Sequence, residues 1–283
     1  MKKVALYIPC FNAGKFLHQA LEAIISQTYP IEEVLIVDDE ASSDNTAGIL
    51  EEWAIKSGCP IRLVSAGYRT GLAHARNVGV MEVKTEFVAS LDADCVPEPD
   101  WLEKLMAGFT EDTIAGVGGK LIESAIFTNA DRWRAEHNRQ DWEDRKVVNP
   151  EFIFGHGNVF RKAPIVEMGG YDIRFRTSAE DYHLSRKLVD SGWKIVYEPD
   201  AVTRHLRTDT VRSLLDANFN YGNWGVKKGL RNTFARSLGH ARKGAAFFWN
   251  DLAGRRWNLL HISLFYPFRL IYRELKMRLN RTQ

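Results

Sequence analysis

The sequence predicts an α/β fold in which a mostly parallel central sheet is flanked by helices. Two observations lead to this prediction. First, continuous apolar runs alternate with helical patterns through the first hundred residues, as is typical of parallel strands that are buried on both faces. Second, polar residues follow the predicted strand ends, and open parallel sheets bind their ligands beyond the carboxyl ends of the strands.

The strands and helices of this first part follow one another at short intervals. We expect strands at 4–8, 34–37, 61–64 and 87–91. The first helix is indicated by apolar residues that recur at i+4, namely Phe16, Ala20 and Ile24. Further helices are expected across 44–56 and 71–83. The polar residues at the strand ends are Asn12 after the first strand, Asp38 and Asp39 after the second, and Asp92 and Asp94 after the fourth.

The pattern is less regular between about 110 and 200. The glycines from Gly116 to Gly119 predict a strand with close backbone contacts, and 131–145 is typical of a polar helix. A loop and strand are expected at 152–161, and a helix at 178–191. Residues 211–283 are expected to be helical, basic and rich in aromatic side chains. No internal repeat divides these parts.

The overall net charge of +2 hides a division between the two ends of the chain. Residues 201–283 carry 16 Lys and Arg against 4 Asp and Glu, whereas the first 200 residues carry 22 against 32. A basic tail of this kind is typical of contact with an anionic membrane surface or a phosphate-bearing acceptor, and equally of a solvated basic helix. Nothing in the sequence indicates a nucleic acid partner.

The cysteines and the apolar runs bear on the compartment. Cys10, Cys59 and Cys95 are widely spaced and form no CxxC pair, which fits reduced thiols in the cytoplasm. The apolar run before Pro9 is too short for a signal peptide and is interpreted as a strand. No run reaches the roughly 20 apolar residues of a membrane span. We therefore expect a cytoplasmic protein that can be peripheral at the membrane.

Asp92 and Asp94 flank Ala93 directly after an apolar strand. Alternate residues of an extended segment point to opposite sides, so one carboxylate can bind a hard cation while the other holds a sugar or ribose hydroxyl. Mg²⁺ or Mn²⁺ bound there would act as a Lewis acid for a diphosphate leaving group. The alternative is a pair of loop aspartates that make turn hydrogen bonds.

Other candidate residues also have structural alternatives. Asp38 and Asp39 could instead precede a cap of the next helix. Asp181 could be a general base, although the spacing Ser178-x-x-Asp181 favours a helix capping box. Arg76 could reach a diphosphate or pair with carboxylates, and a lone His205 is more often structural than a ligand. The phosphate-binding GxxxxGK[ST] loop, the GxGxxG loop and the nucleophile elbow are absent, which disfavours ATPase, dehydrogenase and hydrolase functions.

The order of these pieces resembles family 2 of the inverting glycosyltransferases, which have the GT-A fold. Ile8–Pro30 is similar to the opening strand, Pro-x-aromatic-Asn turn and first helix of that family, and Glu32–Leu50 to its Val-Asp-Asp stretch. Gly71–Asp94 matches the helix and strand that lead into the metal motif. Gly155–His205 matches the acceptor half, including the Glu180-Asp181 pair and a late His. The resemblance covers about residues 2–230.

The resemblance implies a Rossmann-like GT-A catalytic domain over 1–210, with a nucleotide-sugar-binding half at 1–110 and an acceptor-binding half at 111–210, followed by a helical region at 211–283. It implies Asp181 as the base and Glu180 as its neighbour, orienting donor or acceptor. Asp92 and Asp94 would engage the ribose and the metal–diphosphate, with His205 as a further metal ligand. The implied nucleotide-binding residues are Pro9, Phe11, Asn12, Asp38, Asp39, Arg76, Asp92 and Ala93.

The function implied is metal-assisted transfer of one sugar, with inversion, from a nucleoside diphosphate sugar to a hydroxyl of a glycan or lipid-linked acceptor. Mn²⁺ or Mg²⁺ is the implied metal, and a UDP-sugar the expected donor. Glu40 replaces the usual Gly of the family's Val-Asp-Asp-Gly stretch, and the Gln-x-x-Arg-Trp motif of processive members is absent, which favours addition of a single sugar. The alternatives are a sugar nucleotidyltransferase and a catalytically inactive nucleotide- or sugar-binding module.

Overall fold

The structure is a computed structural model of the chain that describes residues 1–38, 42–56, 58–224 and 233–279. Asp39 and Glu40, both singled out from the sequence, lie outside the described residues. The chain forms two compact units. The first comprises Met1–Ser124 with Gln140–Leu206, and the second comprises Ala125–Arg139 with Arg207–Gln283.

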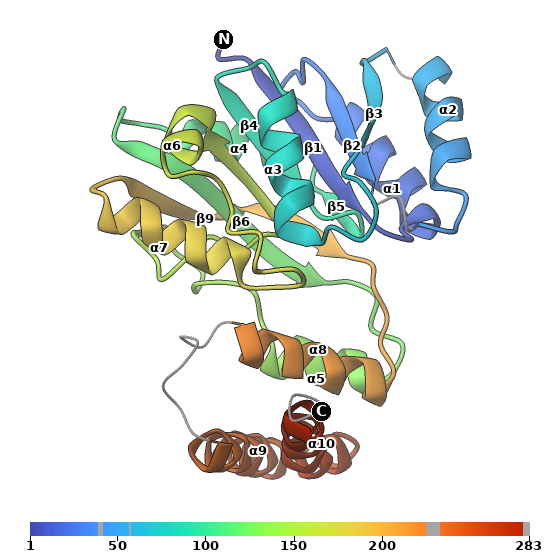
Figure 1. Cartoon of the computed structure of the whole chain (residues 1–283), viewed down its shortest axis with the longest axis vertical. Helices are drawn as coiled ribbons and strands as arrows, with labels where there is room; N and C mark the ends of the chain where they lie inside the picture. Colours follow the sequence, from blue (N-terminus) through green and yellow to red (C-terminus); the bar gives the residue numbers. More distant parts are fainter. Residues whose placement is uncertain (39–41, 57, 225–232, 280–283) are drawn as a thin grey trace. The chain divides into compact units, whose positions relative to one another are not determined.

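The described strands of the first unit form one sheet in the order β3-β2-β1-β4-β8-β6-β9-β5, and β7 pairs with β9 (Figure 1). The strands are β1 (Val4–Cys10), β2 (Val34–Asp38), β3 (Ile61–Ser65), β4 (Phe87–Leu91), β5 (Cys95–Pro97), β6 (Ile114–Glu123), β7 (Val147–Val148), β8 (Gly157–Arg161) and β9 (Lys194–His205). The first four are parallel to one another, whereas β8 is antiparallel to both β4 and β6. The predicted mostly parallel sheet is confirmed, with antiparallel strands added in its second half.

Helices cover both faces of this sheet because successive residues of a strand point to opposite sides. Leu6 and Ile8 of β1 pack in one apolar cluster with α1 and α4, whereas Ala5 and Tyr7 pack in the other with α3 and α7. Gly79 of α3 lets that helix approach Tyr7, since a Cβ there would lie 2.4 Å from the ring. The helices are α1 (Gly14–Ile25), α2 (Thr46–Lys56), α3 (Leu72–Glu82), α4 (Trp101–Ala107), α6 (Lys162–Glu167) and α7 (Glu180–Asp190).

The described helices of the second unit are α5 (Asn129–His137), α8 (Val211–Trp224), α9 (Thr233–Ala253) and α10 (Leu260–Leu279). The expected polar helix at 131–145 is wrong at both ends. It starts at Asn129 because Thr128 and Asp131 form a capping box, in which the Thr128 side chain accepts from the Asp131 N–H at 3.0 Å and Asp131 accepts from the Thr128 N–H at 2.9 Å. It ends at His137, and its apolar face lies in the core of the second unit.

That core surrounds a buried tryptophan on α5. Trp133 stacks with Tyr266 of α10 and meets Phe247 of α9 edge to face. Its indole N–H donates to Ser263, which donates in turn to the buried carboxylate of Asp251. The helical prediction for the basic tail is confirmed for its described residues. No helix in the described part of the chain has both the length and the apolarity to cross a bilayer.

Candidate active site

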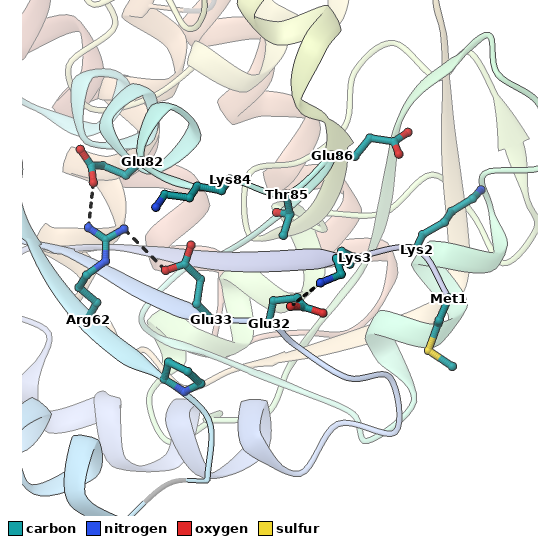
Figure 2. Close-up of a pocket in the computed structure, with 11 residues that line it drawn as sticks. Met1, Lys2, Lys3, Glu32, Glu33, Arg62, Glu82, Lys84, Thr85 and Glu86 are labelled. Atoms are coloured by element: carbon teal, nitrogen blue, oxygen red, sulfur yellow. Dashed lines mark hydrogen bonds and ion pairs between the residues drawn. The ribbon is translucent and has the colours of Figure 1, made fainter.

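The polar residues predicted to form a site lie at the carboxyl ends of β1, β2 and β4, which are parallel and share one edge of the sheet. The opposite edge carries an open depression, shown in Figure 2. Arg62 there pairs with Glu33 and Glu82, and Lys3 pairs with Glu32. Because these residues lie at or near the starts of the strands, the depression lies apart from the predicted site.

Arg76 of α3 is the buried centre of the site. Its side chain is 1% exposed, and its three donor nitrogens all have partners. It donates to Glu180 Oε1 at 3.0 Å, to Ser90 Oγ at 2.7 Å and to Asp92 Oδ1 at 2.8 Å. Burial opposes its charge, yet the carboxylates of Asp92 and Glu180 raise the pKa of Arg76 well above its ordinary value. The guanidinium thus links the turn after β4 to the start of α7. Because all three of its nitrogens bond to protein groups, this arrangement favours a role in positioning Asp92 and Glu180 over direct contact with a nucleotide.

Glu180 and Asp181 stand in different environments. Glu180 is buried, and burial raises its pKa, as does the neighbouring Asp181, while Arg76 lowers it. Its Oε2 has no hydrogen-bond partner among the described residues. Asp181 is less buried, and its two oxygens accept from the N–H groups of Gly155 at 2.9 Å and Tyr182 at 2.7 Å. Burial raises the pKa of Asp181 above its ordinary value, although those backbone bonds lower it, and the same two bonds hold the carboxylate in a fixed orientation.

The capping box predicted for Ser178 and Asp181 is wrong. The residue before α7 is Ala179, no side chain caps the helix, and Ser178 Oγ is buried without a partner in the described chain. Ala179 adopts φ 69°, a left-handed conformation that is unfavourable for a residue with a Cβ. The local geometry therefore turns Asp181 toward the Gly155 loop, and backbone strain beside a carboxylate is typical of functional sites.

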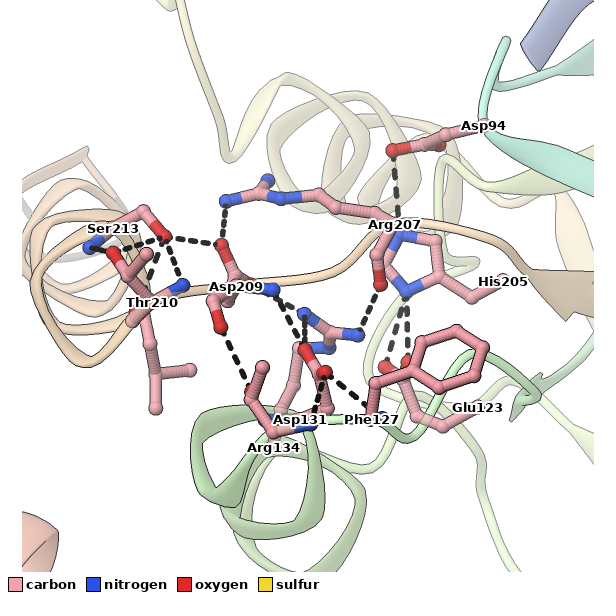
Figure 3. A network of polar contacts seen from close by, with 12 residues as sticks. Asp94, Glu123, Phe127, Asp131, Arg134, His205, Arg207, Asp209, Thr210 and Ser213 are labelled. Carbon is pink, nitrogen blue, oxygen red and sulfur yellow. Dashed lines mark hydrogen bonds and ion pairs between the residues drawn. The ribbon is translucent and has the colours of Figure 1, made fainter. Parts of the chain in front are cut away.

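Asp94 belongs to a second network with His205 and Glu123 (Figure 3). His205 ends β9, Glu123 ends the neighbouring β6, and the two residues pair in register. The imidazole Nε2 lies 3.3 Å from Asp94 Oδ2, and Nδ1 lies 3.0 Å from Glu123 Oε2. Burial opposes a charge on His205, but its hydrogen bonds to Asp94 and Glu123 raise its pKa to about 9.

A divalent cation at this second network would have to displace the proton that the raised pKa keeps on His205, and most of its ligands would come from its substrate. No group of three or more His, Cys, Asp or Glu side chains able to hold a metal occurs among the described residues. Asp94 and His205 would thus supply a carboxylate oxygen and an imidazole nitrogen, donors that suit Mn²⁺. Mg²⁺ and similar ions commonly take one or two protein ligands and fill the remaining positions with phosphate oxygens and water.

The loops after β1 and β2 are linked through the expected nucleotide-binding residues. Asn12 has φ 50°, and its side-chain oxygen accepts from the Ser43 N–H at 2.8 Å. Ser42 Oγ donates to Asp38 at 2.8 Å and accepts from the Asn12 N–H. Phe11 is 59% exposed beside them, so its ring is available to a ligand. Of the other residues implied, Pro9 and Ala93 are half-buried in β1 and in the turn after β4.

Half-exposed aromatic rings lie close to Asp181. Phe152 contacts Trp142, Phe154 and Tyr182 at ring-centroid distances of 5.4, 4.6 and 5.7 Å. The Trp142 indole N–H donates to the Phe152 carbonyl at 2.8 Å, which fixes one ring against the next. Tyr182 follows Asp181 directly, so an aromatic surface adjoins the candidate base.

A protein-family model described as "Glycosyl transferase family 2" matches residues 6–170, which is more than half of the chain. The chain belongs to glycosyl transferase family 2. The matched segment contains Arg76, the turn that bears Asp92 and Asp94, and Gly155, whose N–H donates to Asp181.

Individual family members and solved structures agree with this assignment. Over 231 residues the chain is 29% identical to a pre-mycofactocin glycosyltransferase of Mycobacterium tuberculosis, an alignment that covers 78% of this chain and 46% of that protein. The chain thus spans about half the length of this relative. The mannosyltransferase PcManGT from Pyrobaculum calidifontis, solved with GDP-Man and Mn²⁺, superposes with a TM-score of 0.66 at 20% identity, covering 96% of this chain and 87% of that one. Residues 1–349 of S. aureus TarS, solved with UDP, give 0.58 at 16% identity, covering 98% and 92%. These likenesses confirm the predicted GT-A fold.

Two residues that contact the predicted site residues are not indicated by the sequence. Glu123 ends a strand in a segment without a motif, and only the pairing of β6 with β9 places it on His205. Ser90 is an ordinary strand residue that accepts a hydrogen bond from Arg76. Their partners lie 82 and 14 residues away in the chain, so no local pattern indicates them.

Proposed function

We propose that this family 2 chain is an inverting glycosyltransferase that moves one sugar from a nucleoside diphosphate sugar to an acceptor hydroxyl. One observation carries the proposal: the Asp-x-Asp turn, at the carboxyl ends of the strands, is linked through a buried arginine to the carboxylate pair that contains the candidate base. Arg76 links Asp92 of that turn to Glu180, the neighbour of Asp181. A transferase of this kind needs one group that accepts a proton and another that holds the leaving diphosphate.

Asp181 serves as the general base in this proposal. It takes the proton of the acceptor hydroxyl while that oxygen forms a bond to the anomeric carbon. The bond from the anomeric carbon to the diphosphate oxygen breaks on the opposite face, and the diphosphate leaves with the electron pair. Inversion follows from this single displacement, and no covalent nucleophile is required. The backbone N–H groups of Gly155 and Tyr182 keep the carboxylate oriented for the proton transfer.

Asp94 and His205 would hold Mn²⁺ or Mg²⁺, which would supply Lewis-acid stabilisation of the leaving diphosphate. Glu123 keeps the His205 ring in place through its contact with Nδ1, which leaves Nε2 directed toward Asp94. Asp92 accepts a hydrogen bond from Arg76, and we propose that it binds the ribose or the sugar rather than the cation.

The donor is proposed to be a UDP-sugar, which is supported by the likeness to a TarS fragment solved with UDP. The likeness to a mannosyltransferase solved with GDP-Man keeps guanosine donors as the second candidate. The nucleoside would lie on the linked loops after β1 and β2, where the exposed Phe11 ring can stack on a base and Asp38 can accept a hydrogen bond from it.

The acceptor is proposed to be a glycan or a lipid-linked sugar. The rings of Phe152, Phe154 and Tyr182 beside Asp181 offer an apolar platform for the C–H face of a sugar ring, with its hydroxyl directed at the carboxylate. A lipid-linked acceptor would also bring the protein to an anionic membrane surface, a role proposed for the basic C-terminal helices.

Isothermal titration with UDP, GDP and dTDP, each with and without Mn²⁺, tests the donor site. We expect one diphosphate to bind in a metal-dependent manner, and Asp94→Ala to weaken that binding at least about tenfold because it removes a ligand. Asp190→Ala, at the exposed far end of α7, is the matched control and should bind as the wild type does. Failure of every diphosphate to bind the folded protein would contradict the proposal and favour an inactive module. Preference for a nucleoside triphosphate with a sugar phosphate would favour a nucleotidyltransferase.

Glu123→Gln tests the support of His205. The amide can still contact Nδ1, but it no longer provides a charge that orients and polarises the ring, so metal affinity should fall about 10- to 100-fold. Mn²⁺ titrations in the presence of the preferred diphosphate measure this change. Glu111→Gln, which removes an exposed carboxylate bonded to Lys194, is the control. Unchanged Mn²⁺ affinity in Glu123→Gln would show that His205 does not act as a ligand supported in this way.

A further inference from the structure

The C-terminal helix α10 carries two apolar faces. One face is buried in the core of the second unit, where Ile262, Tyr266 and Leu270 pack. The other is exposed, and its members are Leu264, Phe265, Phe268, Tyr272 and Leu275, each at least half exposed. At about 100° per residue, these five positions fall within an arc of roughly 100°, which is one continuous stripe along the helix. We call these five residues the α10 stripe.

Two tryptophans of the α9–α10 segment are exposed as well. Trp249 of α9 and Trp257 of the turn that joins α9 to α10 are each 64% exposed. The two helices pack against each other, and at Gly244 their approach is so close that a Cβ would lie 2.5 Å from Pro267. Exposed tryptophan, tyrosine and phenylalanine on a packed helical pair are typical of proteins that insert shallowly into the lipid headgroup region.

The acidic and basic side chains of the same segment differ in number and in exposure. Residues 233–279 contain nine Lys and Arg but only two acidic residues, Asp251 and Glu274. Both acidic side chains are buried, at 0% and 3% exposure, and each is paired with an arginine. The exposed charged side chains of this segment, among those described, are all basic: Arg242, Lys243, Arg255 and Lys276.

From this combination we infer that the α9–α10 pair is a membrane-surface anchor that lies flat on an anionic phospholipid bilayer. The α10 stripe and Trp257 enter the headgroup region, and the exposed basic side chains contact lipid phosphates. Charge decides between an anionic lipid and another occupant. A second copy of the chain would bring the basic side chains of two α9–α10 segments together, whereas an anionic lipid surface neutralises them. The inference does not depend on glycosyl transfer, so the two can fail separately.

Vesicle flotation of the full chain tests the anchor. Vesicles of phosphatidylcholine alone are compared with vesicles that also contain phosphatidylglycerol, at low and high salt. We expect binding only to the anionic vesicles, weakened by salt because the attraction is partly Coulombic. The double variant Phe265→Ser/Phe268→Ser should reduce partitioning at least about tenfold, since two aromatic rings no longer enter the lipid. Ile173→Ser, which alters a similarly exposed residue of the first unit, is the control and should leave binding unchanged.

A second readout keeps the inference testable if the double variant loses structure. Arg242→Glu/Lys243→Glu changes only exposed charge and should also weaken binding to anionic vesicles. Tryptophan emission should shift to shorter wavelength on binding, because Trp249 and Trp257 are among the exposed residues. Absence of flotation with anionic vesicles at low salt would overturn the inference. A dimer in sedimentation experiments that dissociates in Phe265→Ser/Phe268→Ser would overturn it too, because it would assign the stripe to a second copy.

Discussion

Replacing Asp181 with asparagine should lower kcat by about 10²- to 10⁴-fold, the range by which a positioned general base accelerates proton transfer. The amide cannot accept the acceptor proton at neutral pH, although it has nearly the same shape as the carboxylate. It keeps only one oxygen, so the N–H groups of Gly155 and Tyr182, which bond to two different oxygens of Asp181, would have to share a single acceptor, and a modest loss of stability is also expected. Donor binding should change little, because Asp181 bonds the Gly155 loop whereas Asp94 and His205 would hold the metal–diphosphate.

Steady-state kinetics, with the nucleotide identified by titration and an acceptor found by product mass spectrometry, measure this effect. Glu180→Gln separates the two neighbouring carboxylates. Glu180 is buried and bonded to Arg76, so its loss should disturb orientation and cost less in kcat than the loss of Asp181. Asp190→Asn on the exposed end of the same helix controls for surface effects. If Asp181→Asn kept more than a tenth of the wild-type kcat, or if Glu180→Gln were the more damaged variant, Asp181 would not be the base.

The fold could be predicted where the chain itself carries the pattern. The strands β1, β2 and β4 are continuous apolar runs, and burial on both faces is what makes such runs continuous. The second half of the sheet was harder to predict because its pairing is non-local. The strand β8 lies antiparallel between β4 and β6, and no feature within Gly157–Arg161 specifies those neighbours. The polar helix α5 begins before its predicted first residue because the capping box of Thr128 and Asp131 sets its start.

The same distinction between local sequence patterns and non-local pairing applies to the site. Asp92, Asp94 and the Glu180-Asp181 pair stand in patterns that can be seen in the sequence, and in the structure Arg76 links Asp92 with Glu180. The partners of these residues are set by tertiary pairing, as with Glu123 on His205. Ser178 shows that a local pattern can also predict a contact that does not form. The spacing Ser178-x-x-Asp181 fits a capping box, yet Ala179 adopts a left-handed conformation and Asp181 accepts from the Gly155 N–H instead.

Replacing Arg76 with methionine should lower the free energy of unfolding by about 3–5 kcal/mol, because it removes one partner from a buried ion pair and leaves the carboxylates of Asp92 and Glu180 without it. Urea denaturation measures this loss. Arg62→Met is a matched control, since Arg62 also bridges two carboxylates but does so on the surface, 43% exposed, where ion pairs contribute about 0–1 kcal/mol. Equal losses in the two variants would show that burial of the Arg76 centre has no energetic consequence.

The pH dependence of the Arg76→Met variant gives a sharper test of the same centre. Burial raises the pKa of both Asp92 and Glu180, and Arg76 is the cation that lowers them. Without it, both folded-state pKa values rise further above the unfolded values of about 4. The folded variant then binds more protons than the unfolded chain as the pH increases from about 4 upward, so its stability falls with rising pH. The destabilisation relative to wild type should therefore be smaller at pH 5 than at pH 8. A difference that is constant across this range would mean that lost packing, rather than uncompensated charge, explains why Arg76 is needed.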